Sequence, residues 1–143
     1  MEPQGIIIEL PKTVTDHFQA GDVIQINPEN NKIKLVDEEY SPYVLGVCVE
    51  DSKPKRKISY YLNGVDMTRP LAEQAVMKVI VAGICVVKTK GLVKIGDLLV
   101  STDDGKAMAA RYNNDHYNDG KIMGKAIQYT ENDDEVIALL SIS

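Results

Sequence analysis

The sequence has few of the residues, and none of the short motifs, on which enzymes and metal sites usually depend. It contains two cysteines and two histidines. Cys48 and Cys85 do not form the Cys-X-X-Cys spacing of a redox or zinc site, and neither histidine is close to a cysteine in sequence. No Gly-X-Ser-X-Gly elbow, phosphate-binding loop or His-Glu-X-X-His motif is present. The sequence therefore predicts no enzyme activity, no metal ion and no cofactor.

The chain also lacks the features of membrane, secreted and nucleic-acid-binding proteins. No apolar run approaches the roughly 20 residues that a membrane-spanning helix needs. The first residues, Met-Glu-Pro-Gln-Gly, do not form the basic start and apolar centre of a signal peptide. A net charge of −5 disfavours a nucleic-acid partner, which requires a basic surface. We expect folding in a cytoplasm, with no membrane and no nucleic acid among the partners.

Strand-forming residues dominate what remains. The longest such stretch, Val79 to Val100, has two apolar runs on either side of the turn Lys88–Gly91. Cys48 and Cys85 lie in apolar runs of this kind, and we expect both to be small buried side chains rather than a disulfide. About ten short runs are separated by turn residues roughly every 8–12 positions. This spacing predicts a single all-β domain over residues 1–143, a small sandwich or barrel.

Two segments depart from this regular spacing. Residues 1–12 contain a short apolar strand that ends at Pro11, which we interpret as a strand or arm that joins the core sheet or a neighbour's sheet edge. Residues 51–77 are predicted to be a hairpin insertion, because Asn63-Gly64 between two β-prone runs is a strong hairpin signal. One short helix is expected over Pro70–Met77, where proline suits the first helical position.

A short pattern occurs twice in the chain. Gly21-Asp22 with two apolar residues precedes Gly46 by 25 residues, and Gly96-Asp97 with two apolar residues precedes Gly124 by 28. An internally duplicated β unit explains this recurrence, and chance repetition in a turn-rich chain is the alternative. The residues that we expect to form structural turns are Gly21, Asp22, Gly46, Gly83, Gly96, Asp97 and Gly124.

The segments Ala-Gly-Asp-Val, Tyr-Val-Leu-Gly-Val, Ile-Gly-Asp-Leu-Leu and Met-Gly-Lys-Ala follow one another within residues 20–49 and 79–140. In this order they resemble a β-rich module of tailed-bacteriophage virion proteins. Such modules occur in capsid decoration (cement) proteins and before the chaperone in tail fibres and neck appendages. The resemblance implies a non-enzymatic homotrimer whose partner is the major capsid protein or another virion protein.

Two departures from that pattern bear on which relative the chain resembles most. The sequence has no Ser-Asp dipeptide, at which some appendage relatives cut themselves, so self-cleavage is not expected. It also has no long helical chaperone segment after the last predicted strand. Both departures favour a capsid decoration or head-fibre protein.

Three groups of side chains are candidates for contact with a partner. The isoleucine run near the N-terminus is the strongest, and a basic cluster in an acidic protein and a neighbouring tyrosine pair are the others. For the basic cluster, solvated charges that protect an edge strand from aggregation are the alternative. The candidates are Ile6, Ile7, Ile8, Lys53, Lys55, Arg56, Lys57, Tyr60 and Tyr61.

The loop Asn113–Asp119, which contains His116, has carboxylate and amide oxygens that suit Ca²⁺. It lacks the ligand spacing of an EF-hand, and we expect a solvated loop.

The function expected from these observations is that of a virion structural protein, assembled in the host cytoplasm, that binds and stabilises the assembled capsid. Two alternatives remain open at this point. One is a tail-fibre or neck-appendage domain involved in host attachment. The other is a cellular β-sandwich binding module with no connection to a virus.

Overall fold

The computed structural model describes residues 2–12, 17–52, 57–58, 61–62, 65–66, 69–70, 76–110 and 122–141. Within these residues all regular secondary structure is β, so the predicted all-β class is confirmed. The strands are β1 (Gln4–Pro11), β2 (Val23–Ile26), β3 (Ile33–Leu35), β4 (Val44–Ser52), β5 (Lys57–Ile58), β6 (Tyr61–Leu62), β7 (Val65–Asp66), β8 (Arg69–Pro70), β9 (Val76–Thr89), β10 (Leu98–Ser101), β11 (Ala107–Ala109), β12 (Gly124–Ala126) and β13 (Asp134–Ser141).

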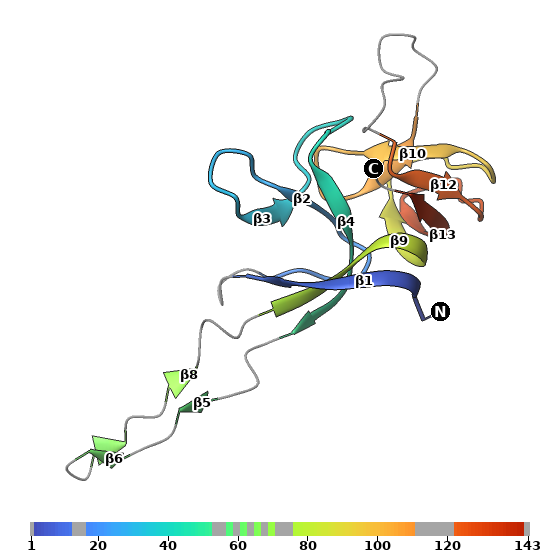
Figure 1. The fold of residues 1–143 in the computed structure, drawn as a ribbon. Helices are drawn as coiled ribbons and strands as arrows, with labels where there is room; N and C mark the ends of the chain where they lie inside the picture. Colours follow the sequence, from blue (N-terminus) through green and yellow to red (C-terminus); the bar gives the residue numbers. More distant parts are fainter. Residues whose placement is uncertain are drawn as a thin grey trace.

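The long strand β9 is the element that all the larger parts of the fold share (Figure 1). Its first half pairs antiparallel with β4 and its second half with β13. Residues 82–84 pair with both β1 and β13, so β1 must lie along the opposite edge from β13. The sequence of β9 suits this central place, because valine and isoleucine favour strands and its apolar side chains pack on both faces.

The second half of β9 belongs to a small closed barrel. The strand order is β9-β13-β12-β10-β11, and β11 returns to β9 through the parallel pair Ala107 and Thr89. The amide of Lys90 donates to the carbonyl of Ala107 at 2.9 Å across this seam. The barrel interior is filled by alternate side chains of the five strands, including Val87, Leu99 and Val136, all buried. The prediction of a sandwich or barrel is therefore settled in favour of a barrel.

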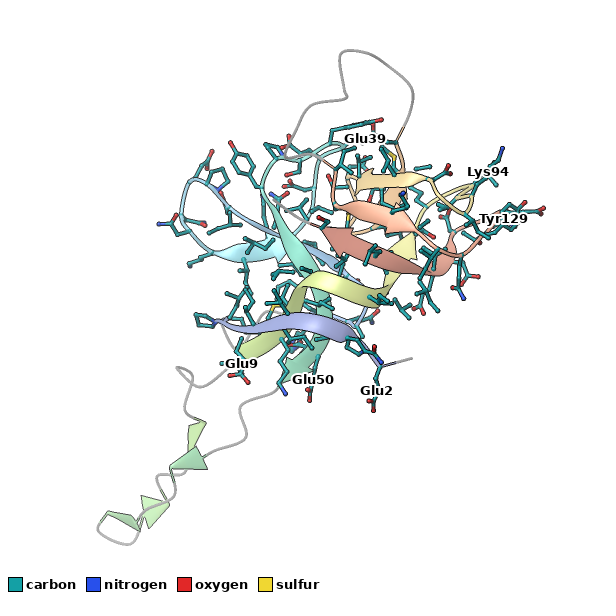
Figure 2. All side chains as sticks on the ribbon, turned by 45° about the vertical axis from the view of Figure 1, so that its right-hand side comes forward. Glu2, Glu9, Glu39, Glu50, Lys94 and Tyr129 are labelled. Atoms are coloured by element: carbon teal, nitrogen blue, oxygen red, sulfur yellow. The ribbon has the colours of Figure 1, made fainter. Side chains whose placement is uncertain are left out.

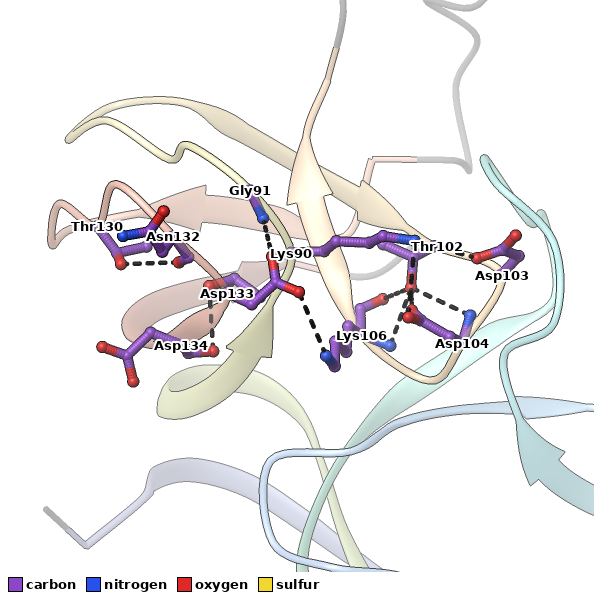
Figure 3. A network of polar contacts seen from close by, with 11 residues as sticks. Lys90, Gly91, Thr102, Asp103, Asp104, Lys106, Thr130, Asn132, Asp133 and Asp134 are labelled. Carbon is purple, nitrogen blue, oxygen red and sulfur yellow. Dashed lines mark hydrogen bonds and ion pairs between the residues drawn. The ribbon is translucent and has the colours of Figure 1, made fainter.

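A network of polar contacts surrounds the seam where the barrel closes (Figure 3). The amide of Gly91 donates to Asp133 Oδ1 at 2.7 Å, and Lys106 Nζ lies 3.8 Å from Asp133 Oδ2. Lys90 Nζ lies 3.6 Å from Asp103 and 3.7 Å from Asp104, and these carboxylates raise the pKa of the Lys90 ammonium. These contacts join the end of β9 to the β10–β11 turn and link that turn and the end of β9 to the β12–β13 turn. They lie around the pair of strands that closes the barrel.

The first half of β9 belongs to a second five-stranded unit that is not closed. Its order is β1-β9-β4-β2-β3, which repeats the order of the closed barrel strand for strand. In the described residues β1 and β3 do not pair with each other. One cluster of buried residues in this unit includes Phe18, Ile24 and Met77. Other buried side chains of the unit, among them Val23, Val47 and Ile80, belong to the same cluster as the barrel core. We call it the open unit, and the barrel the closed unit.

The two Gly-Asp turns have the same geometry in the open and the closed unit. Gly21 and Gly96 have φ angles of 95° and 94°, which glycine adopts without steric cost. Asp22 Oδ2 accepts the Gln19 amide at 2.8 Å, and Asp97 Oδ2 accepts the Lys94 amide at 2.8 Å. Each turn leads into the first strand of a hairpin, β2–β3 or β10–β11.

The glycines further along correspond in the same way. Gly46 pairs with Ile24 in the open unit, and Gly124 pairs with Leu99 in the closed unit. Gly46, Gly83 and Gly124 therefore lie within strands and not in turns, which corrects the prediction for these three residues. They are glycines because a Cβ at each would collide with the backbone of the neighbouring strand.

The predicted insertion lies between β4 and β9 and contains two short antiparallel pairs. Tyr61 pairs with Asp66 and Leu62 with Val65, which places Asn63-Gly64 between paired strands as predicted. The strands β5 and β8 pair in the same sense closer to the sheet, and Figure 1 shows all of these pairs beyond the ends of β4 and β9. The helix predicted over Pro70–Met77 is wrong at both ends, because Pro70 is in β8 and Met77 in β9.

Candidate interaction surfaces

The isoleucine run that the sequence singled out lies on β1, at the margin of the open unit. Ile6, Ile7 and Ile8 are 61%, 41% and 36% exposed. Their exposure follows from the place of β1, which has β9 on one side and no strand on the other among the described residues. An exposed, apolar edge strand presents unpaired backbone groups and apolar surface together, and it is typical of a site that another strand covers.

Two glycines fix β1 tightly against β9. Gly5 faces Gly83, and both have positive φ angles, of 153° and 123°. A Cβ built on Gly5 would lie 2.8 Å from the Gly83 Cα, and one built on Gly83 would lie 2.7 Å from the Gly5 Cα. The strand is therefore a fixed part of the sheet over its length rather than a loose arm.

A cleft of about 330 Å³ opens between the end of β1 and the start of β3. Its walls are mainly apolar, with Leu10, Ile26, Ile33 and Leu45 among the lining residues. In the closed unit the corresponding strand ends meet at Thr89 and Ala107. The cleft thus lies where the open unit would close if β1 paired with β3 as β9 pairs with β11 in the closed unit.

A buried ion pair beside this cleft holds the chain directly after β1. Lys12 Nζ contacts Asp51 Oδ1, and the two side chains are 2% and 13% exposed. The amide of Phe18 donates to Asp51 Oδ2 at 2.9 Å, and the Phe18 ring centroid lies 6.0 Å from Lys12 Nζ. Because Asp51 is in β4, these contacts anchor the chain after β1 to β4.

Sequence reasoning missed a second exposed apolar surface, at the end of the closed unit. The largest exposed apolar side chains there are Ile95 at 71% and Tyr129 at 53%. The backbones of Val93 and Thr130 each donate a hydrogen bond to the other, and the Gly96 amide donates to the Ala126 carbonyl. These bonds bring the turn at residues 92–97 beside the turn at residues 127–133. We call this the barrel-end surface; it comprises Leu92, Ile95, Ile127, Tyr129 and Leu139.

Figure 2 places the barrel-end surface, marked by Lys94 and Tyr129, far from Glu2, Glu9 and Glu50 beside β1. One signal in the sequence could have revealed part of it. Along β13 burial alternates, so that Ala138 and Leu140 face the core and Leu139 between them faces outward. Ile95 and Tyr129 lie in turns, where no periodicity predicts the direction of a side chain.

The remaining candidates fall wholly or partly outside the described residues. Lys53, Lys55, Arg56, Tyr60 and the loop Asn113–Asp119 are not described. Lys57 and Tyr61 are described only by their backbone, in β5 and β6. Within the described ranges no three His, Cys, Asp or Glu side chains are grouped to hold a metal ion. The same ranges contain no helix long and apolar enough to cross a membrane.

The two cysteines are buried free thiols, as the sequence predicts. Burial raises the pKa of Cys48 to about 12, with the Asp22 and Asp51 carboxylates adding to the effect. Burial raises the pKa of Cys85 to about 11. Both thiols therefore stay protonated well above the pH at which an exposed cysteine ionises, and a protonated thiol is a poor nucleophile.

We expect the folded protein at pH 8 to react with a thiol-specific disulfide reagent at least about 100-fold more slowly than the urea-unfolded protein. The raised pKa values also mean that, as pH rises, the thiols of the unfolded chain ionise at a lower pH than those of the folded chain. The free energy of unfolding should therefore fall as pH rises from about 9 toward 11. Absorbance of the released reagent thiolate measures the reactivity. Rapid labelling of the folded protein at pH 8 would contradict the buried placement.

The fold is shared with known phage proteins. The crystal structure of the bacteriophage phi29 gene product 12 C-terminal fragment matches with a TM-score of 0.56 and 14% identity, over 93% of this chain and 98% of that one. Pre-mature phi29 gene product 12 matches with a TM-score of 0.60 and 12% identity, over 100% of this chain and 22% of that one. The head fiber gp8.5 N base of phi29 has a TM-score of 0.48 at 14% identity, with 95% of each chain covered.

No protein-family model and no curated protein sequence matches the chain. At these identities the structural likeness is one of fold. At that level the predicted resemblance to phage virion proteins is confirmed.

Proposed function

We propose that the chain is a non-enzymatic structural protein of a tailed-phage particle, which binds the assembled capsid as a decoration (cement) or head-fibre protein. The observation that supports this proposal most is the fold, which covers the whole chain in its match to phi29 gene product 12. Two exposed apolar surfaces on a small β protein fit a role in holding copies and shell subunits together. The particle, assembled in the host cytoplasm, is the proposed location.

The mechanism is one of linked binding equilibria. A protein that binds the assembled shell and not its free subunits stabilises the shell by RT ln(1 + [L]/Kd), which is about 2.7 kcal/mol per site at a free concentration of 100 Kd. The barrel-end surface is the part of the described chain that we assign to the shell. Ile95 and Tyr129 are aromatic or aliphatic anchors of the kind that dominate interface energies.

Substitution of the barrel-end surface should abolish capsid binding. Shells of the parent phage that have been stripped of this protein should rebind the purified chain and melt at a higher temperature. The double variant Ile95→Asp/Tyr129→Asp should lose this binding by at least about 100-fold, since it buries two carboxylates in an apolar contact. Co-sedimentation and differential scanning calorimetry of the shells measure both effects.

The matched control is Tyr43→Asp, which alters an exposed aromatic side chain that belongs neither to the barrel-end surface nor to β1. It should bind the shells as the wild-type chain does. Mass spectrometry that finds the chain in tails and not in heads would contradict the proposal and favour host attachment. Absence of the chain from purified particles would contradict a virion role altogether.

A further inference from the structure

The open unit has two unpaired strand edges, and they differ in charge. Among the described pairings, β1 pairs only with β9, and β3 pairs only with β2. The exposed carboxylates of Glu2 and Glu9 flank the isoleucines of β1. Lys32 and Lys34 flank Ile33 at the start of β3, and Lys34 Nζ is paired with Asp37 Oδ2 at 2.7 Å within the same molecule. Glu9 on the edge of β1 is therefore complementary in charge to Lys32 at the start of β3, and neither edge is complementary to itself.

The closed unit shows how two such strands pair. There the strand that corresponds to β1 is the second half of β9, and the strand that corresponds to β3 is β11. They pair in parallel at Thr89 and Ala107, and the Lys90 amide bonds to the Ala107 carbonyl. The chain therefore already contains one example of the contact that the open unit lacks.

The open unit cannot make this contact with its own β1. Eight residues of β1 pair with β9, and the Gly5–Gly83 approach fixes the start of the strand. The Lys12–Asp51 ion pair then fixes the chain after β1 to β4. With both ends of β1 held, the gap of about 330 Å³ beside β3 stays open within one molecule.

We propose that a second copy of this chain fills the gap, with β1 of one copy pairing in parallel with β3 of the next. The isoleucines of the incoming β1 cover the apolar cleft, and its Glu9 lies near the basic end of β3. The contact joins unlike surfaces, so it is heterologous and generates a closed ring, such as the trimer that the sequence resemblance implies, or an open fibre. The inference deepens the proposed function by naming the partner of β1, and it is tested without capsids.

Light scattering during size-exclusion chromatography of the purified full chain should give the mass of an oligomer. Ile7→Asp should convert it to a monomer, with a dissociation constant at least about 30-fold higher, because a carboxylate replaces an apolar side chain in the contact. Ile95→Asp, the matched substitution on the barrel-end surface, should leave the mass unchanged. A wild-type chain that is monomeric at 100 µM, or an Ile7→Asp variant that keeps the wild-type mass, would overturn the proposal.

Charge reversal tests the pairing of unlike edges directly. Glu9→Lys and Lys32→Glu should each weaken association by about tenfold, and the double variant should recover most of it. Mixing a copy that carries Glu9→Cys with one that carries Lys32→Cys should give a disulfide-linked pair on oxidation, whereas Glu9→Cys alone should not. Crosslinking of Glu9→Cys with itself would show that β1 pairs with β1 and would refute the head-to-tail arrangement.

These outcomes are distinct from failure of the proposed function. A chain that forms the β1–β3 oligomer but does not bind capsids leaves this inference standing and removes the role in the particle. A monomeric chain that binds capsids through the barrel-end surface does the reverse.

Discussion

A valine in place of Gly46 should destabilise the protein by about 3 kcal/mol or more, enough to leave it largely unfolded at 37 °C. A Cβ at this position would overlap the carbonyl oxygen of Ile80 and lie 3.0 Å from its carbon and 2.6 Å from Val79 Cγ1. These atoms belong to β9, the strand that both units share, so the backbone cannot move aside without disturbing the whole sheet. Urea unfolding followed by circular dichroism measures the loss.

Gly124→Val, the equivalent substitution in the closed unit, should lower the free energy of unfolding to a similar extent. A Cβ at Gly124 would overlap the Leu139 carbonyl oxygen and lie 3.1 Å from the Leu140 Cα. Gly91→Ala is the matched control, because Gly91 has a positive φ of 75° but no atom within 4 Å of a built Cβ. It should cost only about 1–2 kcal/mol, the strain of a left-handed backbone. Wild-type stability of Gly46→Val would contradict the close approach of β4 and β9.

Asp51→Ala should destabilise the protein by about 3–5 kcal/mol, because it removes one charge of a buried ion pair and leaves the other in an apolar setting. The Lys12 side chain is 2% exposed beside Phe18, so its ammonium cannot turn out to water without leaving the structure. The Phe18 amide also loses its acceptor. Thermal and urea unfolding should both report the change.

The neighbouring residue offers an internal control. Glu50 pairs with Lys78 at 3.4 Å, but both side chains are about half exposed, and Glu50→Ala should cost less than about 1 kcal/mol. The double variant Lys12→Met/Asp51→Leu should recover much of the stability that Asp51→Ala loses, since no buried charge remains. Equal effects of Asp51→Ala and Glu50→Ala would show that the Lys12–Asp51 pair is not buried.

Local signals in the sequence were sufficient for the two Gly-Asp turns, the hairpin around Asn63-Gly64 and the class of the fold. Gly21-Asp22 and Gly96-Asp97 form the same turn because glycine supplies the positive φ and aspartate accepts an amide three residues back, and both causes lie within four residues. Asn63-Gly64 lies between paired strands for similarly local reasons. The exposed isoleucines of β1 were also identified as candidates from their position near the N-terminus.

Pairing between distant residues was not predictable from these signals. The first and second halves of β9 look alike in sequence, and nothing local shows that one half serves the open unit and the other the closed unit. The helix over Pro70–Met77 was wrong because pairing with β4 and β1 holds Val76 and Met77 in β9 whatever their local preference. Gly83 was assigned to a turn because its partner, Gly5, lies 78 positions away.

The shared strand has a mechanical consequence. Residues 76–89 run unbroken through both copies of the plan, so no hinge or linker separates the two halves of the molecule along this strand. A force that pulls one half from the other along β9 must load its rows of hydrogen bonds lengthwise and all at once, instead of opening them one after another like a zipper. A molecule fastened to a particle at one end and to its own copies at the other would carry tension through its stiffest element.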